Sequence, residues 1–116
     1  MASFPLQNLN SHNKKATLLE TSIISFNKTA MDSLHTKNYT AAKSLLHRSL
    51  EMLKYPESSD SILKLKSVTY NNLGILYKHI KDYEKSLNYL TLALEVSEIH
   101  GFNRKVLAAI PFEAEF

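Results

Sequence analysis

The sequence predicts an all-α protein built from antiparallel helical hairpins. Apolar residues recur every three to four positions through most of the chain, which is the period of an amphipathic helix. Helix-breaking residues are scarce, since the 116 residues include two Gly and three Pro. No stretch alternates apolar and polar residues for long enough to predict a strand. We therefore expect long helices joined by short turns.

The first predicted hairpin covers 14–56. The apolar spacing of its first helix ends at a polar turn over 35–38. The second helix begins after Asn38, whose side chain can cap a helix N-terminus, and Pro56 cannot continue it. The residues before this hairpin, 1–13, hold few apolar side chains, so they are expected to form a flexible arm.

The second predicted hairpin covers 57–101. Ser and Asp residues in 57–61 can cap its first helix, and Asp82 can cap its second, with Gly101 just past the end. The remainder, 102–116, is expected to form a partial capping helix and a tail, because Pro111 would stop or kink a helix there.

Cysteine content and hydropathy indicate the cellular compartment in which the protein is expected. The chain contains no Cys, which excludes disulfides, thiolate zinc sites and cysteine nucleophiles. No apolar run approaches the length of a membrane span, and the first residues are polar rather than typical of a signal peptide. We expect a cytoplasmic, non-secreted protein. An organelle transit peptide is the alternative, since the first nineteen residues carry two Lys and no acid, although they also lack Arg.

The charge balance does not favour a polyanionic partner. Fourteen Lys and Arg against eleven Asp and Glu give a net charge of +3, and only Arg48 and Arg104 are Arg. Nucleic-acid surfaces are usually more basic and depend on the bidentate guanidinium. The charge therefore indicates solubility rather than nucleic-acid binding.

The chain contains an internal repeat with a period of 44 residues. Seven identical pairs align in about 33 positions, where roughly two would be expected by chance. The pairs are Asn27 with Asn71, His35 with His79, Lys37 with Lys81, Tyr39 with Tyr83, Leu46 with Leu90, Leu50 with Leu94 and Glu51 with Glu95. The repeating unit is one helical hairpin, used twice.

The second unit resembles the tetratricopeptide repeat (TPR) family. The residues that carry the resemblance are Tyr70-Asn71-Asn72-Leu73-Gly74-Ile75-Leu76-Tyr77, Asp82-Tyr83-Glu84-Lys85-Ser86-Leu87, Leu90 and Ala93-Leu94-Glu95. The match is clear over 67–100 and degenerate over 23–56. The long period is similar to that of extended-repeat members in kinesin-light-chain-like, ciliary or cytoskeletal proteins. The resemblance implies a short solenoid of two repeats plus a partial third helix.

Individual residues have physical roles in this repeat. Gly74 would let the two helices of the hairpin approach closely, and Tyr83 would plug the turn end. Ser86 stands where the family usually has Ala, so looser packing is expected there. Two hairpins leave an apolar end face, which we expect 106–112 or a partner protein to cover.

The resemblance implies a non-enzymatic adaptor or scaffold that binds a peptide or helix of a partner protein on its concave face. The candidate binding residues there are Asn27, Lys28, Met31, Asn71, Asn72, Ile75 and Lys78. Asn amides can pair with the main chain of a peptide, and Lys can meet acidic side chains. The alternative for each is an ordinary solvated helix residue.

Two other functions remain open: an architectural subunit of a large assembly, such as a ciliary or cytoskeletal complex, with possible self-association, and a helical RNA-binding module. We expect no membrane partner, no catalytic residue, no metal site and no cofactor. The five His show no ligand spacing, and no phosphate loop or nucleophile motif occurs. Tyr39, Tyr70, Tyr77 and Tyr83 fall on repeat packing positions, which favours a core role over base stacking.

Overall fold

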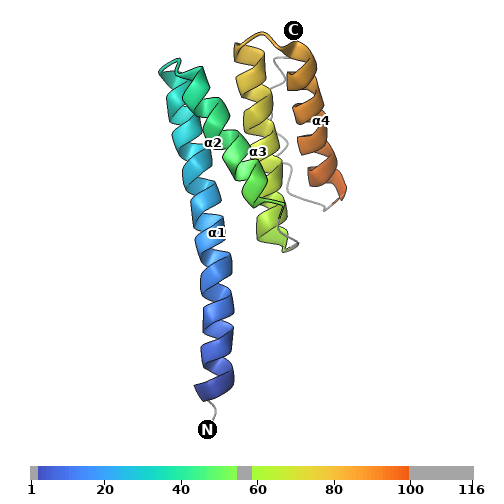
Figure 1. The fold of residues 1–116 in the computed structure, drawn as a ribbon. Coiled ribbons are helices and arrows are strands. Elements are labelled where there is room, and N and C mark those ends of the chain that lie inside the picture. Colours follow the sequence, from blue (N-terminus) through green and yellow to red (C-terminus); the bar gives the residue numbers. More distant parts are fainter. Residues whose placement is uncertain (1–2, 55–58, 100–116) are drawn as a thin grey trace.

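Four helices make up the described part of the chain. The computed structural model describes residues 3–54 and 59–99, and the side chains of 18–54 and 59–99. The helices are α1 (Ser3–His35), α2 (Tyr39–Met52), α3 (Asp60–His79) and α4 (Tyr83–Ile99), and no strand occurs within these ranges. Helices α1 and α2 form one antiparallel hairpin, α3 and α4 form another, and α3 lies against both helices of the first (Figure 1). The all-α prediction is confirmed.

The two hairpin turns have the same conformation, 44 residues apart. Lys37 and Lys81 both adopt left-handed backbone conformations, with φ of 63° and 65°. The amide of the next residue, Asn38 or Asp82, donates to the carbonyl five positions back, at 2.8 and 2.9 Å. The Asn38 and Asp82 side chains then each accept the amide three residues on, at 3.3 Å. The repeat seen in the sequence therefore includes the turn and the helix cap.

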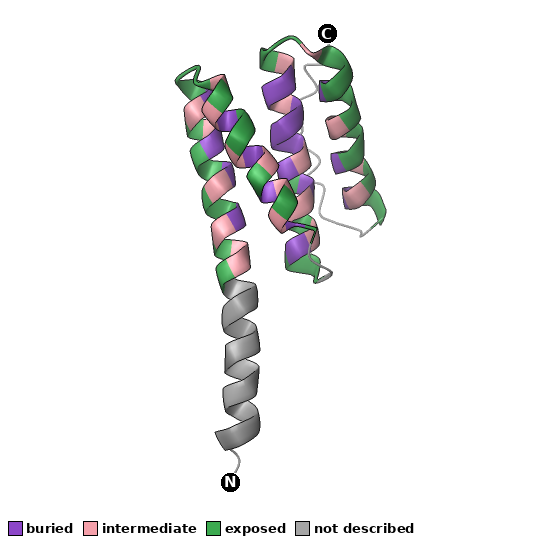
Figure 2. Ribbon diagram, in the orientation of Figure 1, coloured by how far each residue is buried: buried purple, intermediate pink, exposed green. Residues whose placement is uncertain are grey.

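The main apolar core lies where α1, α2 and α3 meet. Its buried members are Ala30, Leu34, Ala42, Leu46, Leu73, Leu76 and Tyr77. A smaller cluster of Ile23, Leu53 and Ile62 connects α1, the C-terminal end of α2 and α3. It lies toward the end of the first hairpin that is opposite its turn. Buried residues run along the length of α3 (Figure 2), because this helix packs on the first hairpin on one side and on α4 on another.

Helices α3 and α4 approach closely at Gly74. A Cβ placed on Gly74 would lie 2.6 Å from Cγ of Leu90 and 3.3 Å from the carbonyl oxygen of Ser86. The predicted role of Gly74 is thus confirmed. The expected looser packing at Ser86 is wrong, because this residue is fully buried and its hydroxyl donates to the Gly74 carbonyl at 2.7 Å.

The ends of the helices differ from the sequence predictions in two places. The structure begins α1 at Ser3, whereas a flexible arm was expected over 1–13. A helix is compatible with these residues, because Pro5 lies in the first turn, where its missing N–H has no intrahelical acceptor. Tyr83 is 44% exposed rather than packed into the hairpin end, since it is the first residue of α4.

The N-terminal part of α1 extends past the other three helices (Figure 1). The expected capping segment over 102–116, including 106–112, and Gly101 lie outside the described residues. Among the described helices, none combines the length and the apolar character needed to span a membrane.

Candidate partner-binding site

The seven predicted binding residues lie on α1 and α3 in three different environments. Lys28 is exposed to solvent. Met31, Ile75 and Lys78 are half-buried. The three asparagines are buried, with exposed fractions of 5% for Asn27 and 9% for Asn71 and Asn72. Lys28 is therefore open to solvent, whereas the three asparagine amides are not.

Asn27 and Asn72 are brought together, and they bind each other. The Asn72 amide donates to the Asn27 side-chain oxygen at 2.9 Å. The Asn27 amide in turn donates to the Ile23 carbonyl at 2.9 Å and to the Thr69 hydroxyl at 3.0 Å, with the Ser49 hydroxyl at 3.5 Å. This buried network joins α1, α2 and α3. The two side chains thus have internal partners that a ligand would have to replace.

Asn71 is the exception among the three. Its side-chain oxygen is buried and has no hydrogen-bond partner among the residues that the structure describes. It lies one turn from Ser67, whose hydroxyl bonds to the Ala93 carbonyl and the Ser97 hydroxyl, so it is on the side of α3 next to α4. A buried acceptor without a partner costs about 1–3 kcal/mol. The site therefore has one buried polar atom without a described donor.

The remaining predicted residues extend from Asn71 along two helices. Ile75 and Lys78 follow Asn71 at helical spacing, so the three form one row on α3. On α1, Lys28 and Met31 share a face in the same way. Met31 and Ile75 both pack against the main core, which places apolar side chains of α1 and α3 beside the same cluster.

A second group of side chains was not anticipated as a site. His47 of α2, Tyr70 and Tyr77 of α3, and Tyr89 of α4 form a cluster that we call the aromatic cluster. Tyr77 and Tyr89 are stacked, with ring centroids 5.6 Å apart and an interplanar angle of 11°. Tyr89 also contacts Tyr70, at 6.1 Å, and a ring nitrogen of His47 lies 2.8 Å from the Tyr77 hydroxyl. The aromatic cluster thereby links three helices.

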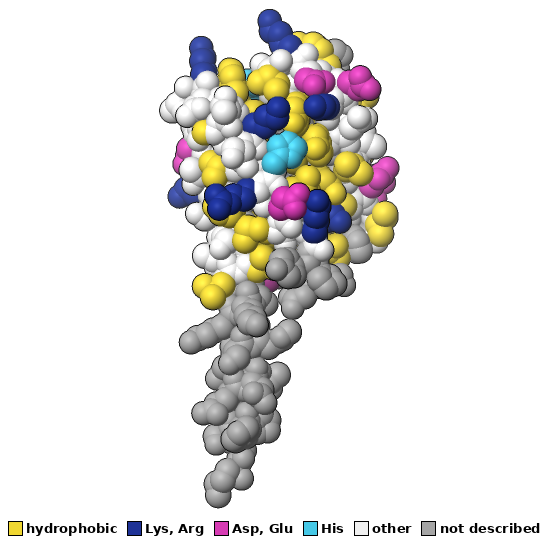
Figure 3. Space-filling view, in the orientation of Figure 1, with side chains coloured by type: hydrophobic (Ala, Val, Ile, Leu, Met, Phe, Trp, Pro, Cys, Tyr) yellow, Lys and Arg dark blue, Asp and Glu magenta, His cyan; other side chains and the backbone are white. Residues whose placement is uncertain are grey.

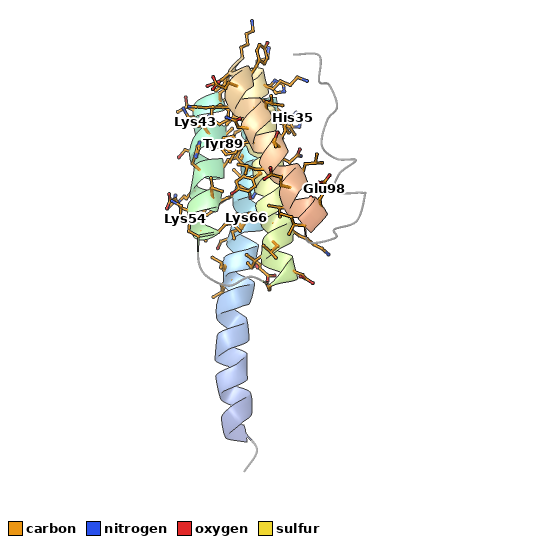
Figure 4. All side chains as sticks on the ribbon, turned by 90° about the vertical axis from the view of Figure 1, so that its right-hand side faces the viewer. His35, Lys43, Lys54, Lys66, Tyr89 and Glu98 are labelled. Carbon is orange, nitrogen blue, oxygen red and sulfur yellow. The ribbon has the colours of Figure 1, made fainter. Side chains whose placement is uncertain are left out.

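Lysines surround the aromatic cluster. The ammonium groups of Lys43 and Lys85 lie 5.9 and 5.4 Å from the centroid of the Tyr77 ring. That of Lys66 lies 6.0 Å from the Tyr70 ring. Cations at such positions are attracted to the faces of aromatic rings. Figure 4 shows Tyr89 between α2 and α4, with Lys43 to one side along the helices and Lys66 to the other.

The sequence contains a pattern that indicates the aromatic cluster and its lysines. Each lysine precedes an aromatic residue of the cluster by four positions: Lys43 and His47, Lys66 and Tyr70, and Lys85 and Tyr89. Residues four apart lie on the same helix face, so the pattern predicts a lysine beside an aromatic on three helices. That the three pairs converge depends on how the helices pack.

Burial and charge shift the pKa values of the cluster. Burial, followed by the nearby Lys43 and Lys85, lowers the pKa of His47, and Glu51 opposes this change. Burial raises the pKa of Tyr70, Tyr77 and Tyr89 above the usual value for a phenol. The neutral forms of His47 and of the tyrosines are therefore favoured in the folded chain.

The side chains of the described residues indicate how a ligand could be bound. No group of three or more His, Asp or Glu side chains that could hold a metal ion occurs in the part of the chain that the structure describes. What these side chains offer is an unpaired amide oxygen, lysine ammonium groups and apolar surface. These groups bind by hydrogen bonds, charge and burial.

Comparisons with known protein families, curated proteins and solved structures find no match to this chain. The resemblance to the TPR family stays a prediction from the sequence.

Proposed function

We propose that this chain is a non-enzymatic protein-interaction module, a short TPR-like solenoid that binds an extended peptide or a helix of a partner protein. Its binding face is formed by α1 and α3, with Asn71, Ile75 and Lys78 on one helix and Lys28 and Met31 on the other. Two hairpins with the same turn conformation, and the close helix approach at Gly74, support the repeat interpretation.

The observation that carries the proposal is the unpaired side-chain oxygen of Asn71. Folded proteins pair the great majority of buried polar atoms, and those left without a partner call for an explanation. A main-chain N–H of a bound peptide would supply the missing donor whatever the peptide's side chains. Beside it, half-buried Ile75 offers apolar contact and exposed Lys28 offers a charge for an acidic group.

The test is selection of peptides from a random library displayed on phage, followed by affinity measurement with synthetic copies. The variant Asn71→Ala should weaken selected peptides by about fivefold or more, because one hydrogen bond in a buried site is lost. The matched control is Asn88→Ala on α4, where the replaced side chain is exposed and the affinity should be unchanged. Selected peptides that bind Asn71→Ala as tightly as the unaltered chain would contradict the proposal.

A second candidate is an architectural subunit that is held by neighbours in an assembly. It is favoured by large apolar side chains exposed on α1 and α4: Leu18 at 65%, Ile24 at 53%, Leu87 at 56% and Ile99 at 75%. Exposed apolar groups of this kind are often covered by partners. Sedimentation equilibrium with circular dichroism across concentration separates the two functions. Self-association, or helix content that falls on dilution, supports the subunit, and a folded monomer at every concentration supports the peptide-binding module.

A further inference from the structure

We propose that the aromatic cluster and its three lysines form a second binding surface, which takes an acidic segment of a protein partner. The surface consists of His47, Tyr70, Tyr77 and Tyr89 with Lys43, Lys66 and Lys85. It is separate from the α1 and α3 face described above, because helical spacing places Tyr70 and Tyr77 on a different side of α3 from Asn71 and Ile75.

The charge of this surface is positive. Its lysines come from three helices and gather around one ring stack, with two ammonium groups within 6 Å of the Tyr77 centroid. Among the described residues, Lys43 and Lys66 form no ion pair, and Lys85 makes only a long one of 4.0 Å to Asp82. Glu51, the acid that acts on His47, is held by Lys54 at 2.9 Å. Carboxylates of a partner would therefore meet lysines with little internal competition.

The surface is also held in place before any ligand arrives. The Tyr77 ring is 2% exposed, is stacked on Tyr89 and shares a short hydrogen bond with His47. The ammonium groups of Lys43 and Lys85 are attracted to the face of the Tyr77 ring, while both side chains stay exposed to solvent. Figure 3 shows hydrophobic side chains gathered in this region, with basic and acidic side chains beside them. Preorganised groups lose less conformational entropy on binding.

The arrangement favours a peptide carboxylate over a nucleic acid. Base stacking needs an aromatic face that is open to solvent, whereas Tyr77 is buried and Tyr70 and Tyr89 are half-buried against each other. The three cations are all lysines, which act as point charges and lack the bidentate geometry of Arg. Ammonium groups form charge-assisted hydrogen bonds with carboxylates. We therefore commit to a segment rich in Asp and Glu.

The experiment measures fluorescence anisotropy of a labelled oligo-glutamate peptide with the full chain at moderate salt. Saturable binding is expected. The single variants Lys43→Glu and Lys85→Glu should each weaken it about five- to tenfold, since an attractive charge becomes repulsive. Glu and Lys have similar helix propensities, and circular dichroism checks that the helices are retained. The matched control is Lys37→Glu in the exposed turn between α1 and α2, which changes the net charge equally outside both surfaces and should change the affinity less than twofold.

Three results would overturn the proposal. The first is the absence of saturable binding to oligo-glutamate. The second is an equal loss in all three variants, which would indicate a general effect of net charge. The third is tighter binding of an oligouridylate that is lost in Lys43→Glu and Lys85→Glu, which would make this a nucleic-acid surface. Because Asn71 is not part of the surface, Asn71→Ala should leave the oligo-glutamate affinity unchanged, so the two proposals fail separately.

Discussion

Asn71 and Asn72 are neighbours in sequence, and both side chains are about nine-tenths buried, yet their surroundings differ. Asn72 points to the junction of the two hairpins and donates to Asn27. Asn71 lies next to α4, and its side-chain oxygen has no hydrogen-bond partner among the described residues. One of the two amides therefore joins the two hairpins, and the other has a buried oxygen without a described donor.

The two amides should respond in opposite ways to truncation. In Asn72→Ala the side-chain oxygen of Asn27 loses its donor inside the core, so the free energy of unfolding should fall by about 1–3 kcal/mol. In Asn71→Ala no described hydrogen bond of the side-chain oxygen is lost and helix propensity improves, so a change within about 0.5 kcal/mol, or a gain, is expected. Urea unfolding followed by circular dichroism measures both. Equal losses would contradict this reading of Asn71.

Lys81 occupies a backbone conformation that suits Gly. Its φ of 65° is left-handed, which costs an L-residue other than Gly about 1–2 kcal/mol. Lys81→Gly should therefore raise the free energy of unfolding, by up to about 1 kcal/mol after the greater entropy of Gly in the unfolded chain is counted. The control is Lys28→Gly in the interior of α1, where Gly should destabilise by about 1 kcal/mol. Thermal unfolding of the two variants should shift in opposite directions.

At the scale of the elements, small residues line the interface between α3 and α4. Gly74 admits Leu90, and the fully buried Ser67, Ser86 and Ser97 use their hydroxyl groups within the interface. Each of these serine hydroxyls donates to a carbonyl or bonds to another serine, so the polar groups do not weaken the contact. The helices are thus held at close range, and the interface has little room for larger side chains.

Gly74→Ala tests this close approach. The new methyl group would overlap the Leu90 side chain at 2.6 Å, so either this side chain or one of the helices must shift. Overpacking of this kind costs about 1–3 kcal/mol, which should exceed the roughly 1 kcal/mol that Ala gains over Gly in helix propensity. Chemical denaturation should therefore show a less stable chain. The double variant Gly74→Ala/Leu90→Ala gives the added methyl group room, and a loss at Gly74 that persists in the Leu90→Ala background would rule out this steric explanation.

His47 links α2 to α3 and should make stability depend on pH. Its pKa is lowered from 6.5 in the folded chain, so the unfolded chain takes up the proton more readily. The free energy of unfolding should accordingly fall as the pH is lowered from about 6.5 toward the folded-state pKa. In His47→Gln this part of the pH dependence should be reduced. Measurement of the free energy of unfolding between neutral and mildly acidic pH tests this prediction. An unaltered pH dependence in His47→Gln would contradict it.

For the whole molecule, α3 is the element shared by both hairpins. It packs on α1 and α2 through the main core and on α4 through the small-residue interface. The aromatic cluster spans α2, α3 and α4 in the same way. Loss of packing at α3 should therefore affect the whole chain rather than one hairpin.

Leu76→Ala tests this coupling. Leu76 is fully buried in the main core, and its truncation should lower the free energy of unfolding by about 2–5 kcal/mol, a large share of the stability of a small domain. Circular dichroism and tyrosine absorbance should report one coincident transition. The control is Leu92→Ala on α4, where the side chain is 37% exposed and the loss should be smaller. Two separate transitions would show that the hairpins unfold independently.

Much of the fold could be predicted from the sequence, because the features concerned are local. Helix periodicity, the caps at Asn38 and Asp82, and the turn that recurs after 44 residues depend on contacts between residues a few positions apart. The role of Gly74 could also be predicted, because the resemblance to the TPR family implies a close approach of the two helices at this position. Local interactions of this kind are encoded in short segments of the chain.

The proposed binding surfaces depend on tertiary structure. Asn27 and Asn72 meet across 45 positions, and the lysine and aromatic pairs of three helices converge on one face. Sequence spacing could indicate which residues share a helix face, but the rotation of each helix about its axis is set by core packing. For this reason Asn27 and Asn72 pair with each other, while the similarly buried Asn71 has a side-chain oxygen without a described partner. The sequence by itself determined the helices and their turns, and the packing of α3 against its three neighbours decided which side chains remain for a partner.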